Sequence, residues 1–448
     1  MSQENLFSFQ PNLKDILSGY PDAETCWIAY SGGLDSHVLL HLLAEIKNDI
    51  KPELVAVHIN HGMNDSAGLW EKHCQKTCEK YGIELLTFPV DLSHNNNKGV
   101  EAFAREKRYE VFGNLIRSHD LLLTAHHMND QVETIFLQLM RGSGPDGLAG
   151  MPQVREFSKG FLLRPLLDYS REDIHDYALK KSLSWVEDDS NKSNKYDRNF
   201  VRNKIIPELL TRWPGALKTV QRVAKHQADV RSLINEISKS DLVKLCDSDY
   251  TKLDISEFDN LSYIRKKNVL RACIKINKLN TPNARIIEKI IAEVIHANTD
   301  RNPCIRWQGS EVRRYRGYLY IMKSLVAHDV EMNKPWKLEE SLKLTSGCLR
   351  AVSGIGNGIK KDMLSNDRVE IRYRQGGEQI RPSGRTGLHE LKKLFQEQGV
   401  LPWLRDRIPL IFYENELIAV ADLWVESKYA ASESEAAWQI IWEWIDDS

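Results

Sequence analysis

Ser31-Gly32-Gly33-Leu34-Asp35-Ser36 is the most informative motif in the first half of this chain. It follows a short apolar run at residues 26–30 and precedes another at residues 37–43, which is the order of a strand, a turn and a helix. The two glycines carry no Cβ, so the backbone can turn sharply and approach a ligand closely. Free N–H groups and the positive end of the helix dipole then face an anion. The sequence therefore predicts a phosphate-binding turn.

This turn differs from the loop that grips β and γ phosphates, because no Lys follows its glycines. It offers instead the carboxylate of Asp35 and the hydroxyls of Ser31 and Ser36. A carboxylate beside phosphates is repelled unless a divalent cation lies between them, which predicts Mg²⁺ at Asp35. The alternative is that Ser31 or Asp35 caps the following helix. Capping would explain one polar residue but not the pair of glycines.

Short apolar runs alternate with helical stretches through the first half of the chain. Strands are predicted at residues 26–30, 53–59, 83–90 and 121–125, and helices at 37–46, 68–81 and 100–116. Nearly continuous apolar runs are typical of parallel strands that are covered on both faces. The pattern predicts an α/β fold with a doubly wound, mainly parallel sheet. The turn and the polar stretches 58–62 and 126–130 follow three of these strands, so they should meet in one crevice.

A helix is predicted to follow residues 126–130, since apolar residues recur at positions 132, 135, 136, 139 and 140. Asp130 and Glu133 fall on its first turn, where a capping box is one interpretation. The other is that carboxylates at this strand end share a metal with Asp35 or receive a cationic substrate. Earlier in the chain, Arg105 shares a helix face with Glu101, so it forms a surface ion pair or reaches a phosphate.

Composition describes an ordinary globular protein of 448 residues, with 42% hydrophobic and 27% charged residues and a net charge of −1. The N-terminus does not resemble a signal peptide, and no apolar run is long enough to span a bilayer. Seven scattered cysteines without a CxxC motif favour reduced thiols in the cytoplasm over disulfides or a zinc site.

Three domains are expected. The strand–helix alternation of residues 1–215 gives way to a mainly helical pattern over 216–327, with β-like alternation from 303 to 322. The polar residues 328–337 are the candidate linker, and residues 338–448 form a mixed α+β domain.

Charge is unevenly distributed along the chain. Residues 191–226 hold nine Lys and Arg but two acids, a net +7, which is the footprint expected for binding a phosphate backbone. A solvated helix surface is the alternative. In the last domain, basic residues alternate with aromatic ones between 381 and 407, around Lys392, Lys393 and Arg405. That stretch suits RNA, or else it holds core aromatic residues beside Arg side chains with exposed ends.

Taken together, these motifs resemble the tRNA(Ile)-lysidine synthases, a family of the N-type ATP pyrophosphatase (PP-loop) superfamily. The turn alone marks only the superfamily, whereas the ordered series of motifs is specific to the family. One departure is Asn129, where many relatives carry an acid, so Asp130 would take over that role. The resemblance rests on residues 31–36, 57–62, 101–109, 125–134, 141–151, 164–167, 187–191, 198–202, 391–395 and 399–409.

The resemblance implies a two-step ligation that uses ATP and Mg²⁺. ATP adenylylates O2 of the wobble cytidine in an isoleucine tRNA with a CAU anticodon, and pyrophosphate leaves. The ε-amine of free L-lysine then attacks C2 and displaces AMP, which leaves lysidine and changes codon recognition from AUG to AUA. The resemblance also allows a homodimer, and it gives the membrane no role.

Site residues follow from the same resemblance. Residues 31–36 would hold the leaving pyrophosphate with Mg²⁺ on Asp35, while Val57 and His58 would meet adenine. Asp130 and Glu133 would pair with the lysine ammonium, and Arg105 and Arg202 would stabilise phosphates. The expected tRNA contacts are His127, Asn129, Arg198, Arg202, Lys392, Lys393 and Arg405.

Three other functions compete with this one. A tRNA thiolase of the same superfamily typically needs paired reactive cysteines, which this sequence does not offer. An amide-forming synthetase for small metabolites would need neither the segment of charge +7 nor a basic last domain. A nucleotide-sensing or RNA-binding module without catalysis would bind ATP and release no pyrophosphate with tRNA present.

Overall fold

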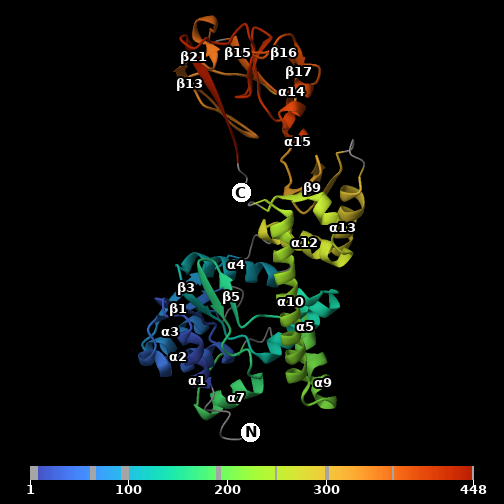
Figure 1. Cartoon of the computed structure of the whole chain (residues 1–448). Helices are drawn as coiled ribbons and strands as arrows, with labels where there is room; N and C mark the ends of the chain where they lie inside the picture. The colour runs from blue at the N-terminus through green and yellow to red at the C-terminus, as the bar shows by residue number, and fades with distance from the viewer. Residues whose placement is uncertain are drawn as a thin grey trace. The chain divides into compact units, whose positions relative to one another are not determined.

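The computed structural model describes residues 9–60, 67–91, 100–187, 193–247, 250–297, 302–365 and 368–445 (Figure 1). The chain forms two compact units that divide between Leu233 and Ile234, and each is described by itself. Among the described residues, no helix combines the length and the apolar character needed to cross a membrane.

A six-stranded sheet organises the first unit, in the order β3-β2-β1-β4-β6-β5. All neighbours are parallel except β5 and β6. Strand β1 pairs with β2 on one side and β4 on the other, so the strand order reverses at β1 and the ligand crevice is expected there. The strands are β1 (Thr25–Ala29), β2 (Glu53–Asn60), β3 (Glu84–Pro89), β4 (Leu121–Leu123), β5 (Val154–Phe157) and β6 (Gly160–Leu163).

Helices cover both faces of this sheet, which confirms the predicted doubly wound, mainly parallel fold. On one face Leu39 and Leu43 pack with Ile174 in a large apolar core. On the other face Phe112 and Ile116 pack against the strands. The helices are α1 (Phe9–Ser18), α2 (Leu34–Ile46), α3 (Ala67–Tyr81), α4 (Val100–Leu115), α5 (Met128–Met140), α6 (Pro145–Leu148) and α7 (Arg171–Lys180), with a 3₁₀ turn at Lys47–Asp49.

A helical run after residue 196 was not predicted in detail. It consists of α8 (Asp197–Phe200), a π-helical segment (Val201–Ile205) and α9 (Ile206–Arg212). Val201 and Ile206 pack on Val132, so this run lies against α5. π-helical segments are rare and often occur at functional sites. The long helix α10 (Ala216–Leu245) follows.

The second unit begins with the end of α10 and continues as a helical region, as the sequence predicts. Its four-stranded antiparallel sheet, β7-β10-β9-β8, includes the strands expected between residues 303 and 322. The helices are α11 (Ile255–Asp259), α12 (Tyr263–Ile276), α13 (Ala284–Lys289) and a π-helical segment (Ile290–Ile295); the strands are β7 (Lys252–Asp254), β8 (Cys304–Trp307), β9 (Ser310–Tyr315) and β10 (Tyr318–Lys323).

The C-terminal region is mixed α+β, as expected, and its sheets are antiparallel. The linker predicted over 328–337 is partly wrong, because Asn333–Pro335 forms β11 and pairs with β15. The larger sheets run β11-β15-β18-β19-β20 and β12-β13-β21-β14. The elements are β12 (Leu342–Leu344), β13 (Gly347–Ile355), β14 (Ile359–Lys360), a 3₁₀ turn (Lys361–Met363), β15 (Val369–Arg372), β16 (Gln379–Ile380), β17 (His389–Glu390), α14 (Leu391–Glu397), α15 (Pro402–Arg405), β18 (Leu410–Tyr413), β19 (Glu416–Val420), β20 (Trp424–Val425) and β21 (Ala436–Trp444).

Candidate active site

The glycine turn joins β1 to α2 in the conformation that a phosphate-binding turn requires. Gly32 has a φ of +83°, and a Cβ there would lie 2.9 Å from the Cys74 sulfur, so the position demands glycine. Gly33 is the N-cap of α2 in extended backbone, and within the described structure no side chain caps this helix. The capping interpretation of Ser31 or Asp35 is therefore wrong. The uncapped N–H groups remain available to an anion.

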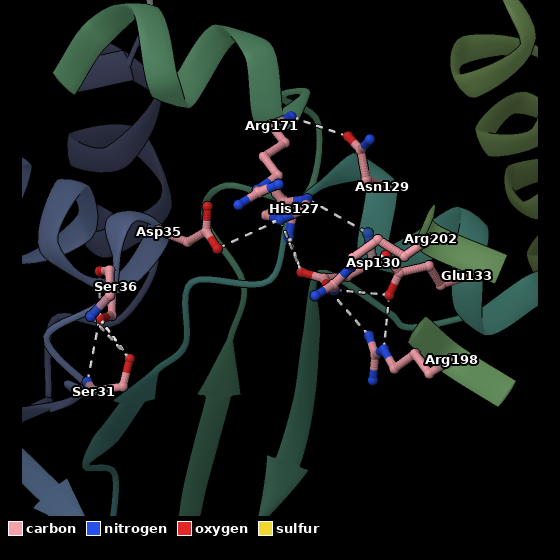
Figure 2. A network of polar contacts seen from close by, with 11 residues as sticks. Ser31, Asp35, Ser36, His127, Asn129, Asp130, Glu133, Arg171, Arg198 and Arg202 are labelled. Atoms are coloured by element: carbon pink, nitrogen blue, oxygen red, sulfur yellow. Dashed lines mark hydrogen bonds and ion pairs between the residues drawn. The ribbon is translucent and has the colours of Figure 1, made fainter. Parts of the chain in front are cut away.

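The hydroxyls of Ser31 and Ser36 hold the turn closed (Figure 2). Their oxygens lie 3.0 Å apart, and the Ser31 N–H donates to the Ser36 hydroxyl at 3.2 Å. Ser36 in turn donates to the Gly33 carbonyl at 3.0 Å. The Val186 N–H donates to the Gly32 carbonyl at 3.0 Å, which anchors the turn to a distant part of the chain.

Asp35 points from the first turn of α2 toward His127 (Figure 2). One carboxylate oxygen, Oδ2, lies 3.7 Å from His127 Nε2. The other, Oδ1, is buried and has no hydrogen-bond partner among the described residues. Such an oxygen fits Mg²⁺, which is commonly held by one or two carboxylates plus phosphates and water. The described residues contain no group of three or more His, Cys, Asp and Glu arranged for a metal.

His127 begins α5 and forms a capping box with Asp130. The Asp130 N–H donates to His127 Nδ1 at 3.5 Å, and the His127 N–H donates to Asp130 Oδ2 at 3.1 Å. Burial lowers the pKa of His127, but the neighbouring carboxylates of Asp130 and Asp35 outweigh burial, so the pKa lies above its usual value. The predicted capping box therefore exists, with Asp130 in it and Glu133 outside it.

Glu133 and Asp130 bind two arginines from the helical run after residue 196 (Figure 2). Glu133 is fully buried and accepts from Arg202 Nε at 2.6 Å and from Arg198 Nε at 2.8 Å. Asp130 Oδ1 accepts from Arg198 at 3.1 Å and from Arg202 at 3.0 Å. Two carboxylates and two guanidinium groups thus form a closed, charge-balanced cluster, which we call the arginine–carboxylate cluster.

Electrostatics within this cluster keep its members charged. Burial alone would raise the pKa of the Asp130 carboxyl, but His127 and Arg198 hold it well below its ordinary value. Burial alone would lower the pKa values of Arg198 and Arg202, and the carboxylates raise them instead. These contacts argue against the interpretation in which Asp130 shares a metal with Asp35, because two guanidinium groups already bind its oxygen Oδ1.

Val57 and His58 are buried at the end of β2. Val57 packs in the apolar core beneath α4. His58 Nδ1 lies 3.0 Å from the Tyr30 carbonyl oxygen, which fixes the ring next to the strand that carries the glycine turn. His61 and Gly62 of the same motif, and residues 188–192, lie outside the described residues.

Asn129 and Arg105 do not belong to the arginine–carboxylate cluster. The Asn129 side chain accepts a hydrogen bond from the Arg171 N–H at 3.0 Å, so it links α5 to the start of α7. Arg105 is exposed on α4, and its guanidinium lies 5.1 Å from the centre of the Tyr109 ring. The side chain of Glu101 falls outside what the structure describes, so its pairing with Arg105 stays a prediction.

The segment of charge +7 is divided between structural and exposed cations. Arg198 and Arg202 belong to the arginine–carboxylate cluster, and Lys225 contacts Asp168 at 3.1 Å. The exposed members are Lys195, Lys204, Arg212, Lys218, Arg222 and Lys225, while Lys192 lies outside the described residues.

The predicted RNA stretch of the last domain is mostly structural at its aromatic residues. Phe395 is fully buried and Trp403 nearly so. Arg405 donates to the Val400 carbonyl at 2.9 Å and to the Tyr315 hydroxyl at 3.0 Å, whereas Lys392 and Lys393 are exposed. The expectation of a basic last domain is also wrong as a whole, since residues 338–448 contain 14 Lys and Arg but 18 Asp and Glu.

One contact that sequence reasoning missed is the pairing of residues 198 and 202 with residues 130 and 133. The signal was present as two acids three positions apart and two arginines four positions apart, which are both spacings of one helix face. Sequence spacing, however, does not say which helices face each other. The arginines were instead predicted to meet the tRNA or its phosphates.

Comparisons with known proteins identify the family. Residues 6–209 match the model of the PP-loop domain, 253–320 that of the TilS substrate binding domain and 369–442 that of the TilS substrate C-terminal domain. A tRNA(Ile)-lysidine synthase of Coxiella burnetii is 39% identical over 97% of this chain and 96% of its own length. One from Methylococcus capsulatus is 37% identical over 94% of this chain and 97% of its own length. The chain belongs to the tRNA(Ile)-lysidine synthase family.

Proposed function

We propose that this enzyme uses ATP to join L-lysine to C2 of the wobble cytidine of an isoleucine tRNA. An adenylylated tRNA would be the intermediate, and AMP and pyrophosphate would be released. The observation that carries the proposal is the uncapped glycine turn beside Asp35, whose Oδ1 has no partner among the described residues. Relatives that match nearly the whole chain are named for this product.

The glycine turn would bind the phosphates that leave as pyrophosphate. Its N–H groups and the dipole of α2 favour negative charge at this point. Asp35 would hold Mg²⁺, which supplies positive charge to the phosphates as the bond to the α-phosphate breaks. Val57 and His58 belong to β2, which pairs with β1, and adenine is expected beside them.

The arginine–carboxylate cluster would hold two guanidinium groups in fixed positions near the turn. Glu133 and Asp130 fix the guanidinium groups of Arg198 and Arg202 before substrate binds, so little reorganisation is needed during the reaction. Direct pairing of Asp130 or Glu133 with the lysine ammonium would require one of these arginines to move. We therefore propose that the two carboxylates act chiefly by holding the arginines.

Cysteine chemistry favours this ligation over thiolation. Cys74 and Cys78 belong to α3, and the Cys74 sulfur faces Gly32 of the glycine turn. Burial raises the pKa of each thiol to about 12. Thiols with such pKa values remain protonated and unreactive near neutral pH. Adenylyl transfer followed by attack of an amine needs no enzyme thiol.

The test is incorporation of labelled lysine. The enzyme is incubated with a CAU-anticodon isoleucine tRNA transcript, ATP, Mg²⁺ and labelled L-lysine, and tRNA is then recovered and counted. We expect label in the tRNA only when ATP and Mg²⁺ are both present. A matched transcript with a GAU anticodon should remain unlabelled. No label in the CAU transcript, with ATP bound normally, would refute the proposal.

The reaction would occur in the cytoplasm. A homodimer stays a prediction, which sedimentation would test.

A further inference from the structure

A second group of cations lies around Tyr109. The Arg105 guanidinium lies 5.1 Å from the centre of the Tyr109 ring, and that of Arg155 lies 5.7 Å from it. Arg155 also lies 5.5 Å from the ring of Phe157, which packs with Tyr109. Arg105 and Tyr109 come from α4, and Arg155 and Phe157 from β5; the two elements meet on the face of the sheet covered by Phe112 (Figure 1).

Arg164 is the third cation of this group and is almost completely buried, with 3% of its surface exposed. Its NH1 donates to the Pro152 carbonyl at 2.6 Å, but its Nε is buried and has no partner among the described residues. Burial and the nearby charges of Arg155 and Arg105 lower its pKa to about 10, against the opposing effect of Tyr109. A buried guanidinium normally has an anionic partner, because desolvating an unpaired charge is costly.

No carboxylate supplies that partner within the described part of the chain. Neither Arg105, Arg155 nor Arg164 forms an ion pair with a described Asp or Glu, in contrast to Arg198 and Arg202. Three positive charges that converge without an acid form a site for an external anion. Guanidinium groups match the geometry of phosphate oxygens in particular.

The position of the group on the sheet separates it from the expected place of ATP. Arg164 directly follows β6, and Arg155 lies opposite Leu162 in the pairing of β5 with β6. Both are therefore near the carboxyl end of β6, two strands from the glycine turn on β1. Two strand spacings are about 10 Å. Because Val57 and His58 lie on β2, on the opposite side of β1, the nucleotide should extend away from this group.

We propose that Arg105, Arg155 and Arg164 bind a backbone phosphate of the tRNA, next to the nucleotide that is modified. The inference rests on the proposed function and adds a binding site to it. Arg155 and Arg105 are exposed and would reach the phosphate first. Arg164 is held by the Pro152 carbonyl and almost completely buried, so it would add its positive charge from beneath the anion rather than contact it directly.

The test compares tRNA binding by the wild-type enzyme and the Arg155→Gln variant, without lysine or ATP. Affinity for the CAU-anticodon isoleucine tRNA is measured by filter binding over a series of KCl concentrations. We expect binding about tenfold weaker, as for the loss of a charge-assisted hydrogen bond. The slope of log K against log salt should fall by about 0.7 to 0.9, the value for one phosphate contact. Arg155→Lys keeps the charge, so its slope should remain close to that of the wild type.

Lys159→Gln is the matched control. Lys159 is an exposed cation in the turn of the same β5–β6 hairpin, but at the opposite end of the strands. Its loss should leave tRNA affinity and the salt slope unchanged. A drop equal to that of Arg155→Gln would show a general charge effect and would overturn the proposal.

ATP affinity of the same variants distinguishes the two sources of phosphate. The Kd for ATP should be unchanged in Arg155→Gln. Weaker ATP binding with normal tRNA binding would assign the group to the nucleotide and contradict the proposal, as would no change in either. If the wild-type enzyme binds the tRNA but attaches no lysine, the proposed function fails, whereas this comparison still decides whether Arg155 contacts RNA.

Discussion

Asp35 and Glu133 are both acidic residues near the site, but their surroundings give them different tasks. Asp35 is about one-third exposed, and its Oδ1 has no partner among the described residues. Glu133 is fully buried, and both of its oxygens accept hydrogen bonds from arginines. Oδ1 of Asp35 could therefore bind a metal, whereas Glu133 holds two arginines in place.

Replacing Asp35 should abolish catalysis and spare the fold. Asp35→Asn keeps the shape of the side chain but removes the charge that holds Mg²⁺, so we expect pyrophosphate release to fall about 100-fold or more. The thermal unfolding midpoint should change little, since Asp35 does not cap α2. Asp49→Asn, which removes a surface acid paired with Lys14, is the control and should retain full activity. Normal turnover by Asp35→Asn would contradict the assignment of Mg²⁺ to this residue.

Replacing Glu133 should instead destabilise the first unit. Glu133→Gln leaves the partly buried Arg198 and Arg202 with too little negative charge, and breaking a buried ion pair in this way costs about 3–5 kcal/mol. Urea unfolding monitors the loss. Glu110→Gln removes one partner of the surface pair with Lys107 and should cost less than about 1 kcal/mol. Equal effects of the two substitutions would show that the arginine–carboxylate cluster does not stabilise the fold.

His127 makes stability depend on pH in a predictable direction. Its pKa in the folded protein is raised, because Asp130 and Asp35 outweigh burial and Arg202. A raised pKa means that the folded state binds the proton more tightly, so this contribution is present below about pH 6.5 and is lost as pH rises through the folded-state pKa. His127→Asn keeps a capping side chain but lacks the proton. The difference in free energy of unfolding between wild type and His127→Asn should therefore shrink from pH 6 to pH 8 in urea titrations. A constant or growing difference would contradict a raised pKa of His127.

The glycine turn shows what an element contributes beyond its residues. Gly32 and Gly33 are adjacent, but only Gly32 has a positive φ, and only a Cβ at Gly32 would clash. At Gly33 a Cβ would make ordinary contacts at 3.5 Å with Ser31 and 3.8 Å with Val186. The first glycine is thus required for folding of the turn, and the second for access of the ligand.

This difference gives a paired prediction. Gly32→Ala should lower stability by about 1–3 kcal/mol, the usual cost of a residue held in strained backbone. Gly33→Ala should fold normally and weaken ATP binding, because its methyl group would occupy the surface that faces the phosphates. Gly68→Ala in α3, where a Cβ would meet nothing within 4 Å, is the control for both. Calorimetry measures ATP affinity, and unaltered binding by Gly33→Ala would contradict the assignment of the turn.

Elements with strong local signals were predictable from the sequence. Strands β1 to β4 begin and end within two residues of the predicted bounds, because each is a mainly apolar run and three of them, β1, β2 and β4, have buried residues. The β5–β6 hairpin was missed, since both strands have four residues and β5 is largely exposed. The π-helical segment Val201–Ile205 was also missed, because residue patterns distinguish it poorly from an α-helix.

Over the whole chain, the sequence predicts which segments are rich in charged residues better than it predicts the partners of those residues. The segment 191–226 is strongly basic, but its most buried arginines bind carboxylates of α5. Arg405, predicted to meet RNA, bonds instead to Tyr315. Such partners depend on how distant elements pack against each other. Local patterns in one sequence do not reveal that packing. Residues of the glycine turn were easier to assign, because their chemistry is contained in six consecutive positions.

The stoichiometry of ATP cleavage with CAU-anticodon tRNA and labelled L-lysine is the sharpest test of the proposed ligation. Parallel samples contain ATP labelled at the α-phosphate, which reports AMP and ADP, or at the γ-phosphate, which reports pyrophosphate and inorganic phosphate. The products are separated by chromatography, and lysine in the tRNA is counted in the same samples. We predict one AMP and one pyrophosphate for each lysine attached, with no ADP. Formation of ADP and inorganic phosphate, or of AMP without lysine in the tRNA, would contradict the account.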